Sequence, residues 1–137
     1  MSLNDQTTSI GELRDKVRRF IQSRDWDQFH TPKDLSIGLI TEASELLECF
    51  RFRSNAEVAR LLQDDEDFRR ALRHELADSL FFVLALSRKL DIDLSQALAE
   101  KMALSAQRYP VELVRGKNDK YTAYRQGEGG QGDRGAR

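Results

Sequence analysis

Residues 38–50 read GLITEASELLECF, and this stretch decides how the chain is expected to fold. Its apolar residues Leu39, Leu46 and Phe50 recur at the spacing of an amphipathic helix, and Leu35, just before the stretch, fits the same spacing. Glu42 projects within about 20° to 80° of these residues, so it lies on the apolar side, and Glu45 lies one step round on the same flank. An unpaired ionised carboxylate is very costly to bury. The two acids therefore require compensation by cations, by protonation or by a bound metal.

A second stretch repeats this arrangement. Residues 65–90 form the longest apolar-periodic run of the sequence. On the helical face of Glu75, within roughly 60° of it, are Phe68, Leu72 and Phe82. Asp78 follows three residues after Glu75. If the two helices pack side by side, Glu42, Glu45, Glu75 and Asp78 converge into an all-oxygen site, the kind that Mg²⁺ or Mn²⁺ prefers.

Paired acids on a helix can also occur without a bound metal. Glu-x-x-Glu and Glu-x-x-Asp arise by chance in charged helices, where they are solvated or paired with Arg and Lys. A ferritin-like di-iron site is the alternative metal centre, but it needs Glu-x-x-His pairs, and neither His30 nor His74 follows a Glu at that spacing. Because two acid pairs lie on two core-facing stripes, we interpret them as metal ligands.

The rest of the chain also has helical periodicity. Thr31 is a suitable N-cap with Pro32 in the first helical position, and Pro110 cannot continue a helix. The expected helices cover residues 9–24, 31–50, 55–63, 65–90 and 93–109. The sequence has no strand-period alternation and no glycine-rich phosphate loop. It therefore predicts an all-α fold with four main helices joined by short connections, that is, a four-helix bundle.

Composition limits the remaining choices. The 137 residues suit one compact domain, expected over residues 1–116, and the glycine-rich tail of residues 117–137 is expected to be largely disordered. The 22 basic and 23 acidic side chains give a net charge of -1, so no nucleic-acid or membrane surface is predicted. A single cysteine, Cys49, and the lack of signal-peptide features in the first residues indicate a cytoplasmic protein.

Five stretches of the sequence resemble one enzyme family. They are RDWDQFHTPKDL (24–35), EASELLECFRF (42–52), HELADSLFFVLALSRKLDIDL (74–94), KMALSAQRYPVE (101–112) and DKYTAY (119–124). In this order and spacing they resemble the all-α nucleoside triphosphate pyrophosphohydrolases of the MazG-like superfamily, and most of all its dCTP pyrophosphatase-like branch. The resemblance covers nearly everything except the two ends of the chain.

The resemblance implies an activity and a cofactor. Members hydrolyse nucleoside triphosphates to a monophosphate and diphosphate, as a house-cleaning reaction on standard or modified nucleotides, and a dCTP-like substrate is the first expectation here. Glu42, Glu45, Glu75 and Asp78 would be the catalytic residues, holding Mg²⁺, with Mn²⁺ as an alternative. One of them, or the nearby Glu48, would take the proton of the attacking water. The resemblance also implies a homodimer or homotetramer.

The resemblance further suggests substrate-binding residues. Trp26 would stack on the base, although it is equally suited to be a hydrophobic plug between helices. Phe52 stands where relatives commonly carry a tryptophan near the base. Lys101 and Arg108 match basic positions associated with phosphates, the alternative being exposed surface charge, and Tyr109 belongs to the same block. Ser105 replaces an asparagine that is common in relatives, so the choice of nucleotide stays open.

Two other functions are compatible with the sequence. A non-catalytic helical interaction module would pair the inward acids with Arg51, Arg70 or Arg73 and bind no metal. A related enzyme would hydrolyse phosphoribosyl-ATP or dUTP instead, although the RDWDQFH and RYP blocks argue against it.

Overall fold

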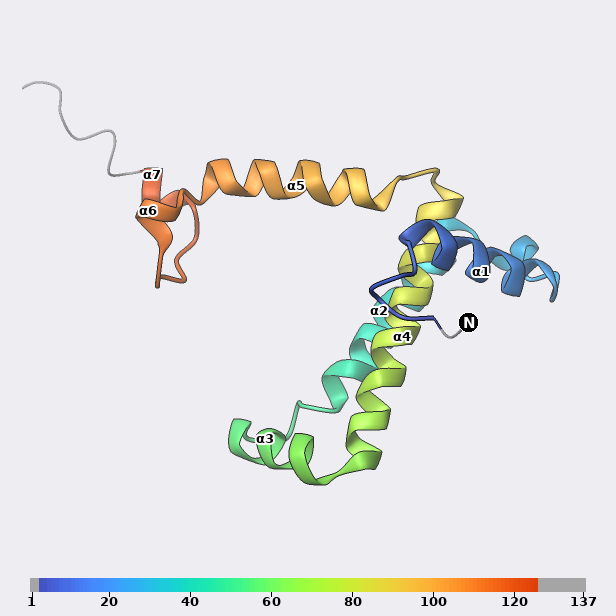
Figure 1. Ribbon diagram of the computed structural model, residues 1–137, viewed down its shortest axis with the longest axis horizontal. Helices are drawn as coiled ribbons and strands as arrows, with labels where there is room; N and C mark the ends of the chain where they lie inside the picture. The colour runs from blue at the N-terminus through green and yellow to red at the C-terminus, as the bar shows by residue number, and fades with distance from the viewer. Residues whose placement is uncertain (1–2, 126–137) are drawn as a thin grey trace, which may run out of the picture. The chain divides into compact units, whose positions relative to one another are not determined.

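The computed structural model describes residues 3–125, and within that range it contains helices and no strand (Figure 1). The elements are α1 (Ile10–Gln22), the 3₁₀ turn η1 (Asp27–Phe29), α2 (Pro32–Glu48), α3 (Asn55–Asp64), α4 (Glu66–Lys89), α5 (Leu94–Arg108), α6 (Val111–Val114) and α7 (Thr122–Arg125). The prediction of an all-α fold is confirmed, and all five predicted helices are present.

The helices begin where the sequence supplies a cap. The Ser9 and Thr31 hydroxyls accept hydrogen bonds from the backbone N–H three residues on, and the acid at that position bonds back in both cases. At α4, the Asp65 carboxylate accepts from the N–H of Phe68 at 2.9 Å. Each such cap stabilises a helix by about 1 kcal/mol. The caps therefore fix the starts of α1, α2 and α4 to within one residue of the predicted positions.

Helix α4 is the element against which α1, α2 and α3 pack. Figure 1 shows α2 running along it, and α1 and α3 also contact it. The core between these helices centres on Ile21, Leu35 and Ala85, with four half-buried residues around them: Val17, Phe81, Phe82 and Leu86. Toward the other end of α4, the Phe50 ring meets Phe68 edge to face, with centroids 6.2 Å apart. Burial of these apolar faces supplies most of the stability of such helices.

One glycine sets how closely α2 approaches α4. A Cβ added to Gly38 would lie 2.2 Å from the Cε1 atom of Phe82 and 2.5 Å from its Cζ. Both distances are far shorter than any real carbon contact, so the Phe82 ring occupies the space that a larger residue at position 38 would need. Gly38 lies one turn before Glu42, and Phe82 lies one turn after Asp78. This contact therefore fixes the spacing of the two helices beside the paired acids.

The chain divides into two compact units, the first up to Leu94 and the second from Ser95. Nearly all of α5, the fourth long helix expected from the sequence, belongs to the second unit together with α6 and α7. In this unit the Tyr109 ring contacts the rings of Tyr121 and Tyr124 edge to face, at 6.2 and 6.4 Å. Part of the predicted tail, residues 117–125, thus contains a short helix. Residues 126–137 lie outside the described residues, and the domain boundary at residue 116 stays a prediction.

A membrane-spanning helix must be both long and apolar. None of the helices within residues 3–125 combines enough length and apolar character to cross a membrane.

Candidate metal centre

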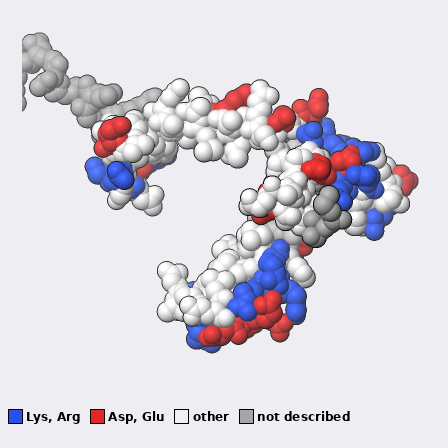
Figure 2. All heavy atoms as spheres, viewed as in Figure 1, with Lys and Arg blue, Asp and Glu red and all other residues white. Residues whose placement is uncertain are grey.

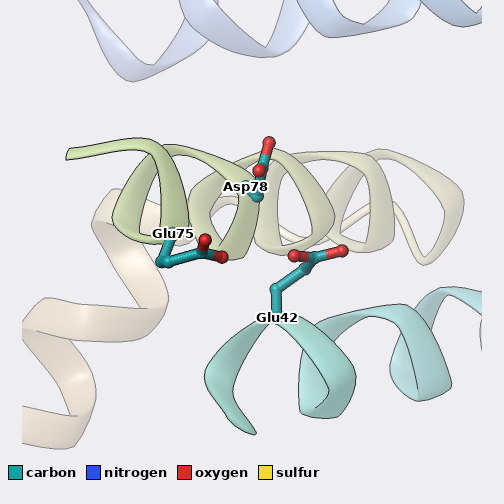
Figure 3. A group of neighbouring side chains, drawn as sticks. All are labelled: Glu42, Glu75 and Asp78. Carbon is teal, nitrogen blue, oxygen red and sulfur yellow. The ribbon is translucent and has the colours of Figure 1, made fainter. Parts of the chain in front are cut away.

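Three carboxylates from two helices meet in the first unit. Glu42 extends from α2, and Glu75 and Asp78 extend from neighbouring turns of α4 (Figure 3). One oxygen of each lies within 4.8 Å of the others. The inward direction of Glu42 and Glu75 follows from the sequence, because each lies on the stripe through which its helix packs against the other. The predicted meeting of acids from two helices is therefore what the structure shows for these three residues.

The group is partly withdrawn from solvent and has no cationic partner among residues 3–125. Glu42 and Glu75 are half-buried, whereas Asp78 is exposed. The Glu75 Oε2 atom is buried and accepts no hydrogen bond from the part of the chain that the structure describes. Burial first, and then repulsion from Glu45, Asp78 and Glu75, raises the pKa of Glu42 above its ordinary value. Three hard oxygen donors with uncompensated charge are the ligands that a divalent cation such as Mg²⁺ or Mn²⁺ takes.

The arginines that the interaction-module hypothesis needs are paired elsewhere. Arg51 bonds Glu48 at 2.7 Å, Arg70 bonds Asp67 at 2.5 Å and Arg73 bonds Glu66 at 2.8 Å. Figure 2 shows acidic and basic side chains intermingled around α3 and the start of α4. The alternative in which these arginines compensate the inward acids is therefore contradicted. Glu48, the additional candidate for the general base, is the ion-pair partner of Arg51.

Glu45, the fourth predicted ligand, differs from the other three. Its side chain is exposed, and it is not one of the three residues whose oxygens lie within 4.8 Å of one another. It is still close enough to contribute to the raised pKa of Glu42. Its part in binding a metal stays a prediction.

The two aromatic residues predicted at a nucleotide base are both accessible. Trp26 precedes η1, is 43% exposed and meets the Phe20 ring edge to face at 5.9 Å. Phe20 in turn contacts Phe81 of α4 at 5.8 Å. Phe52 is 82% exposed, and the Arg51 guanidinium lies 4.9 Å from its ring centroid. Trp26 thus packs against Phe20 without being a fully buried plug, and the Phe52 side chain is mostly exposed beside Arg51.

The remaining predicted substrate residues, Lys101, Arg108 and Tyr109, belong to the second unit. Lys101 and Arg108 are exposed, and the Arg108 guanidinium lies 5.3 Å from the Tyr121 ring centroid. Tyr109 joins the same aromatic group through its contacts with Tyr121 and Tyr124. Their contact with a nucleotide stays a prediction.

Sequence reasoning missed two features beside these residues. The close approach of Gly38 to Phe82 had a signal, because a lone glycine inside a helical pattern usually has a packing reason. The ion pair of Asp27 with Arg88 had none, since 61 positions separate the two residues and neither belongs to a periodic pattern that would pair them.

The raised pKa of Glu42 makes the effect of a divalent cation depend on pH. In the metal-free protein, a carboxyl with a raised pKa favours the folded state at low pH, and this contribution is lost as the pH rises through that pKa. A cation binds only the ionised carboxylates, so Mg²⁺ is expected to raise the melting temperature by a few degrees near neutral pH. The gain should disappear near pH 4. Thermal melts with and without Mg²⁺ across this range measure it, and an equal gain at both ends would contradict the assignment.

Comparisons with known proteins identify the family of the chain. The sequence model of the MazG-like family matches residues 37–123, the range that contains all three clustered acids. dCTP pyrophosphatase 1 of Rattus norvegicus is 39% identical over 114 residues, which are 83% of this chain and 66% of the relative. The human protein of the same name is 34% identical with the same coverage. The chain thus spans about two thirds of the length of these curated relatives.

A solved structure shares the fold. A pyrophosphatase from Archaeoglobus fulgidus superposes with a TM-score of 0.69 and is 32% identical, covering 80% of this chain and 99% of that one. The predicted resemblance to the dCTP pyrophosphatase-like branch is confirmed by these matches. The protein belongs to the MazG-like family.

Proposed function

We propose that the protein is a metal-dependent nucleoside triphosphate pyrophosphohydrolase that converts a (d)NTP and water into the (d)NMP and diphosphate. The observation that carries the proposal is the meeting of Glu42, Glu75 and Asp78 from two packed helices, without a cationic partner among residues 3–125. Relatives named dCTP pyrophosphatase, and a structural neighbour named a pyrophosphatase, support this reaction and a dCTP-like substrate. The single cysteine supports a reducing, cytoplasmic location.

The clustered acids fit a cation such as Mg²⁺. Glu42, Glu75 and Asp78 would hold it, with Glu45 as a fourth ligand. When bound, such a cation neutralises phosphate charge and stabilises the leaving diphosphate. The oxygen of a water attacks the α phosphorus, the bond from that phosphorus to the α–β bridging oxygen breaks, and diphosphate leaves with the bonding electrons. A carboxylate of the cluster accepts the proton of the water.

Two groups of predicted substrate-binding residues, one in each unit, belong to this proposal. Trp26 and Phe52 have accessible rings on which a nucleobase can stack. Lys101 and Arg108 are exposed cations suited to phosphate oxygens, and Tyr109 supports the aromatic group beside Arg108.

The proposal includes self-association as a homodimer or homotetramer. Helices α2 and α4 carry large apolar side chains that are at least 41% exposed: Ile37, Ile40, Leu47, Leu76 and Leu80. Apolar residues gathered on neighbouring helices in this way are typical of a surface that binds another protein. Light scattering at micromolar concentration tests the association, and a strict monomer would oppose it.

Product analysis tests the reaction. The protein is incubated with Mg²⁺ and each of a set of nucleotides that includes dCTP, dUTP and the ribonucleotides, and products are separated by ion-exchange chromatography. dCMP and diphosphate are expected from dCTP. Release of inorganic phosphate with dCDP would show cleavage at a different bond and overturn the proposed reaction.

A further inference from the structure

The segment that carries Trp26 is tied to the end of α4 by charge. The Asp27 carboxylate of η1 accepts a hydrogen bond from Arg88 Nη2, and Lys89 Nζ lies 3.5 Å from the same oxygen. Lys89 also donates to the Asp27 backbone carbonyl at 3.3 Å. We call these three residues the Asp27 clasp. Unlike the pairs within α1 and α4, which join residues three to seven apart, the clasp spans 61 and 62 positions.

The clasp is less exposed than an ordinary surface ion pair. The side chains of Arg88 and Lys89 are 23% and 28% exposed, and that of Asp27 is 41% exposed. Partial burial raises the pKa of Asp27, but attraction and hydrogen bonds from Arg88 and Lys89 outweigh it and leave the pKa below its ordinary value. The Arg88 Nε atom is buried without a partner of its own among the described residues. Loss of Asp27 would therefore leave a half-buried guanidinium without compensation, which is unfavourable.

Trp26 is held from two sides as a result. It directly precedes Asp27, and its ring edge contacts Phe20. The Arg24 guanidinium lies 3.6 Å from the Phe20 ring centroid and 5.8 Å from that of Trp26. The Trp26 backbone is hydrogen-bonded to Ile21 and Phe29, and the clasp ties the next residue, Asp27, to α4. The indole still remains 43% exposed, so it is held in place and open to solvent at once.

We propose that the Asp27 clasp is a positioning device that fixes Trp26 for stacking on the base of the nucleotide; this rests on the proposed function. A ring that is already ordered costs less entropy when the ligand binds, so preorganisation strengthens substrate binding. Arg88 lies ten residues beyond Asp78, about 15 Å along the helix. Loss of the clasp should therefore change KM while kcat changes little.

The test uses Trp26 itself, because it is the only tryptophan of the chain. Asp27→Asn and Arg88→Met remove one partner each, and Arg88→Lys keeps the positive charge. Arg70→Met is the matched control, since Arg70 is also an α4 arginine paired with an aspartate, Asp67. Tryptophan emission and its quenching by acrylamide are recorded without nucleotide, and KM and kcat are measured for the substrate found by product analysis.

We expect Asp27→Asn and Arg88→Met to shift the emission to longer wavelength, to increase quenching and to raise KM roughly three- to tenfold. kcat should stay within about twofold, since the clasp touches no residue of the acid cluster. Arg88→Lys should keep the emission, the quenching and KM close to those of the parent. Arg70→Met should match the parent in all of them. Lys89→Met, which keeps the Asp27–Arg88 bond, replaces Arg88→Met in the comparison if circular dichroism shows that the latter is unfolded.

The outcomes separate this proposal from the proposed function. Unchanged emission and quenching in the folded Asp27 and Arg88 variants would overturn the clasp, whatever the activity. Altered fluorescence with an unchanged KM would overturn its role in substrate binding. If the parent hydrolyses no nucleotide, the proposed function fails and the substrate role with it. The fluorescence comparison then still decides whether the clasp holds Trp26.

Discussion

Glu75→Gln is expected to lower kcat for nucleotide hydrolysis by roughly 100-fold or more, because a bound metal contributes several kcal/mol to such a reaction and each 1.4 kcal/mol is a factor of ten. The substitution keeps the volume of the side chain and removes its charge. The Oε2 atom of Glu75 is the buried carboxylate oxygen that has no partner among residues 3–125, so the amide would lose the most direct contact with a cation. Glu42→Gln should act in the same direction. Activity assays beside calorimetric titration with Mg²⁺ measure both effects.

Stability separates a lost metal ligand from a damaged fold. Burial, and then repulsion from neighbouring acids, raises the pKa of Glu42, so Glu42→Gln should leave the metal-free protein at least as stable as the parent near neutral pH. The same variant should lose the stabilisation by Mg²⁺. Asp67→Asn is the control, because Asp67 lies on α4 in an exposed pair with Arg70. Parent-like turnover and Mg²⁺ binding in Glu75→Gln would refute the assignment of this cluster as the metal site.

Helical periodicity predicted the inward direction of Glu42 and Glu75 because direction around a helix is a local property. The starts of α1, α2 and α4 were predictable for a similar reason, since each cap involves residues three apart. Which flanking acid joins the cluster was not predictable in this way. Asp78 joins it and Glu45 does not, which depends on how α2 and α4 are rotated and spaced against each other.

Two other contacts between distant residues were beyond the reach of sequence patterns. The sequence allowed Trp26 to be either a plug or an accessible ring, and the choice depends on its edge contact with Phe20 and on the pairing of Asp27 with Arg88. No periodicity relates residues 61 positions apart. The same holds for Gly38 and Phe82, where the sequence supplies the unusual glycine but not the ring that faces it.

Gly38→Ala is expected to destabilise the protein by about 1 to 3 kcal/mol, the usual cost of overpacking a filled interior. Helix propensity alone predicts that Gly38→Ala stabilises the protein, because alanine is favoured over glycine by about 1 kcal/mol inside a helix. The steric effect dominates here, since the added Cβ would lie 2.2 Å from the Phe82 ring, which itself packs against the core. Thermal or denaturant unfolding measures the change.

The chain offers a matched control for this substitution. Gly11 also lies in a helix, α1, but a Cβ there would have its nearest neighbour, Ser9 Oγ, at 3.7 Å, an ordinary contact. Gly11→Ala should therefore be neutral or stabilising. Phe82→Leu removes the ring, so the double variant Gly38→Ala, Phe82→Leu should be more stable than the sum of the two single effects predicts.

The same substitution tests whether helix spacing controls the metal centre. Because Gly38 and Phe82 each lie one turn from a clustered acid, an overlap between them should move α2 away from α4 and separate Glu42 from Asp78. Gly38→Ala should then bind Mg²⁺ more weakly even at temperatures where it stays folded, whereas Gly11→Ala should bind it like the parent. If Gly38→Ala unfolds at or above the temperature of the parent and binds Mg²⁺ equally well, the Phe82 ring can move aside, and the spacing of the acids has another cause.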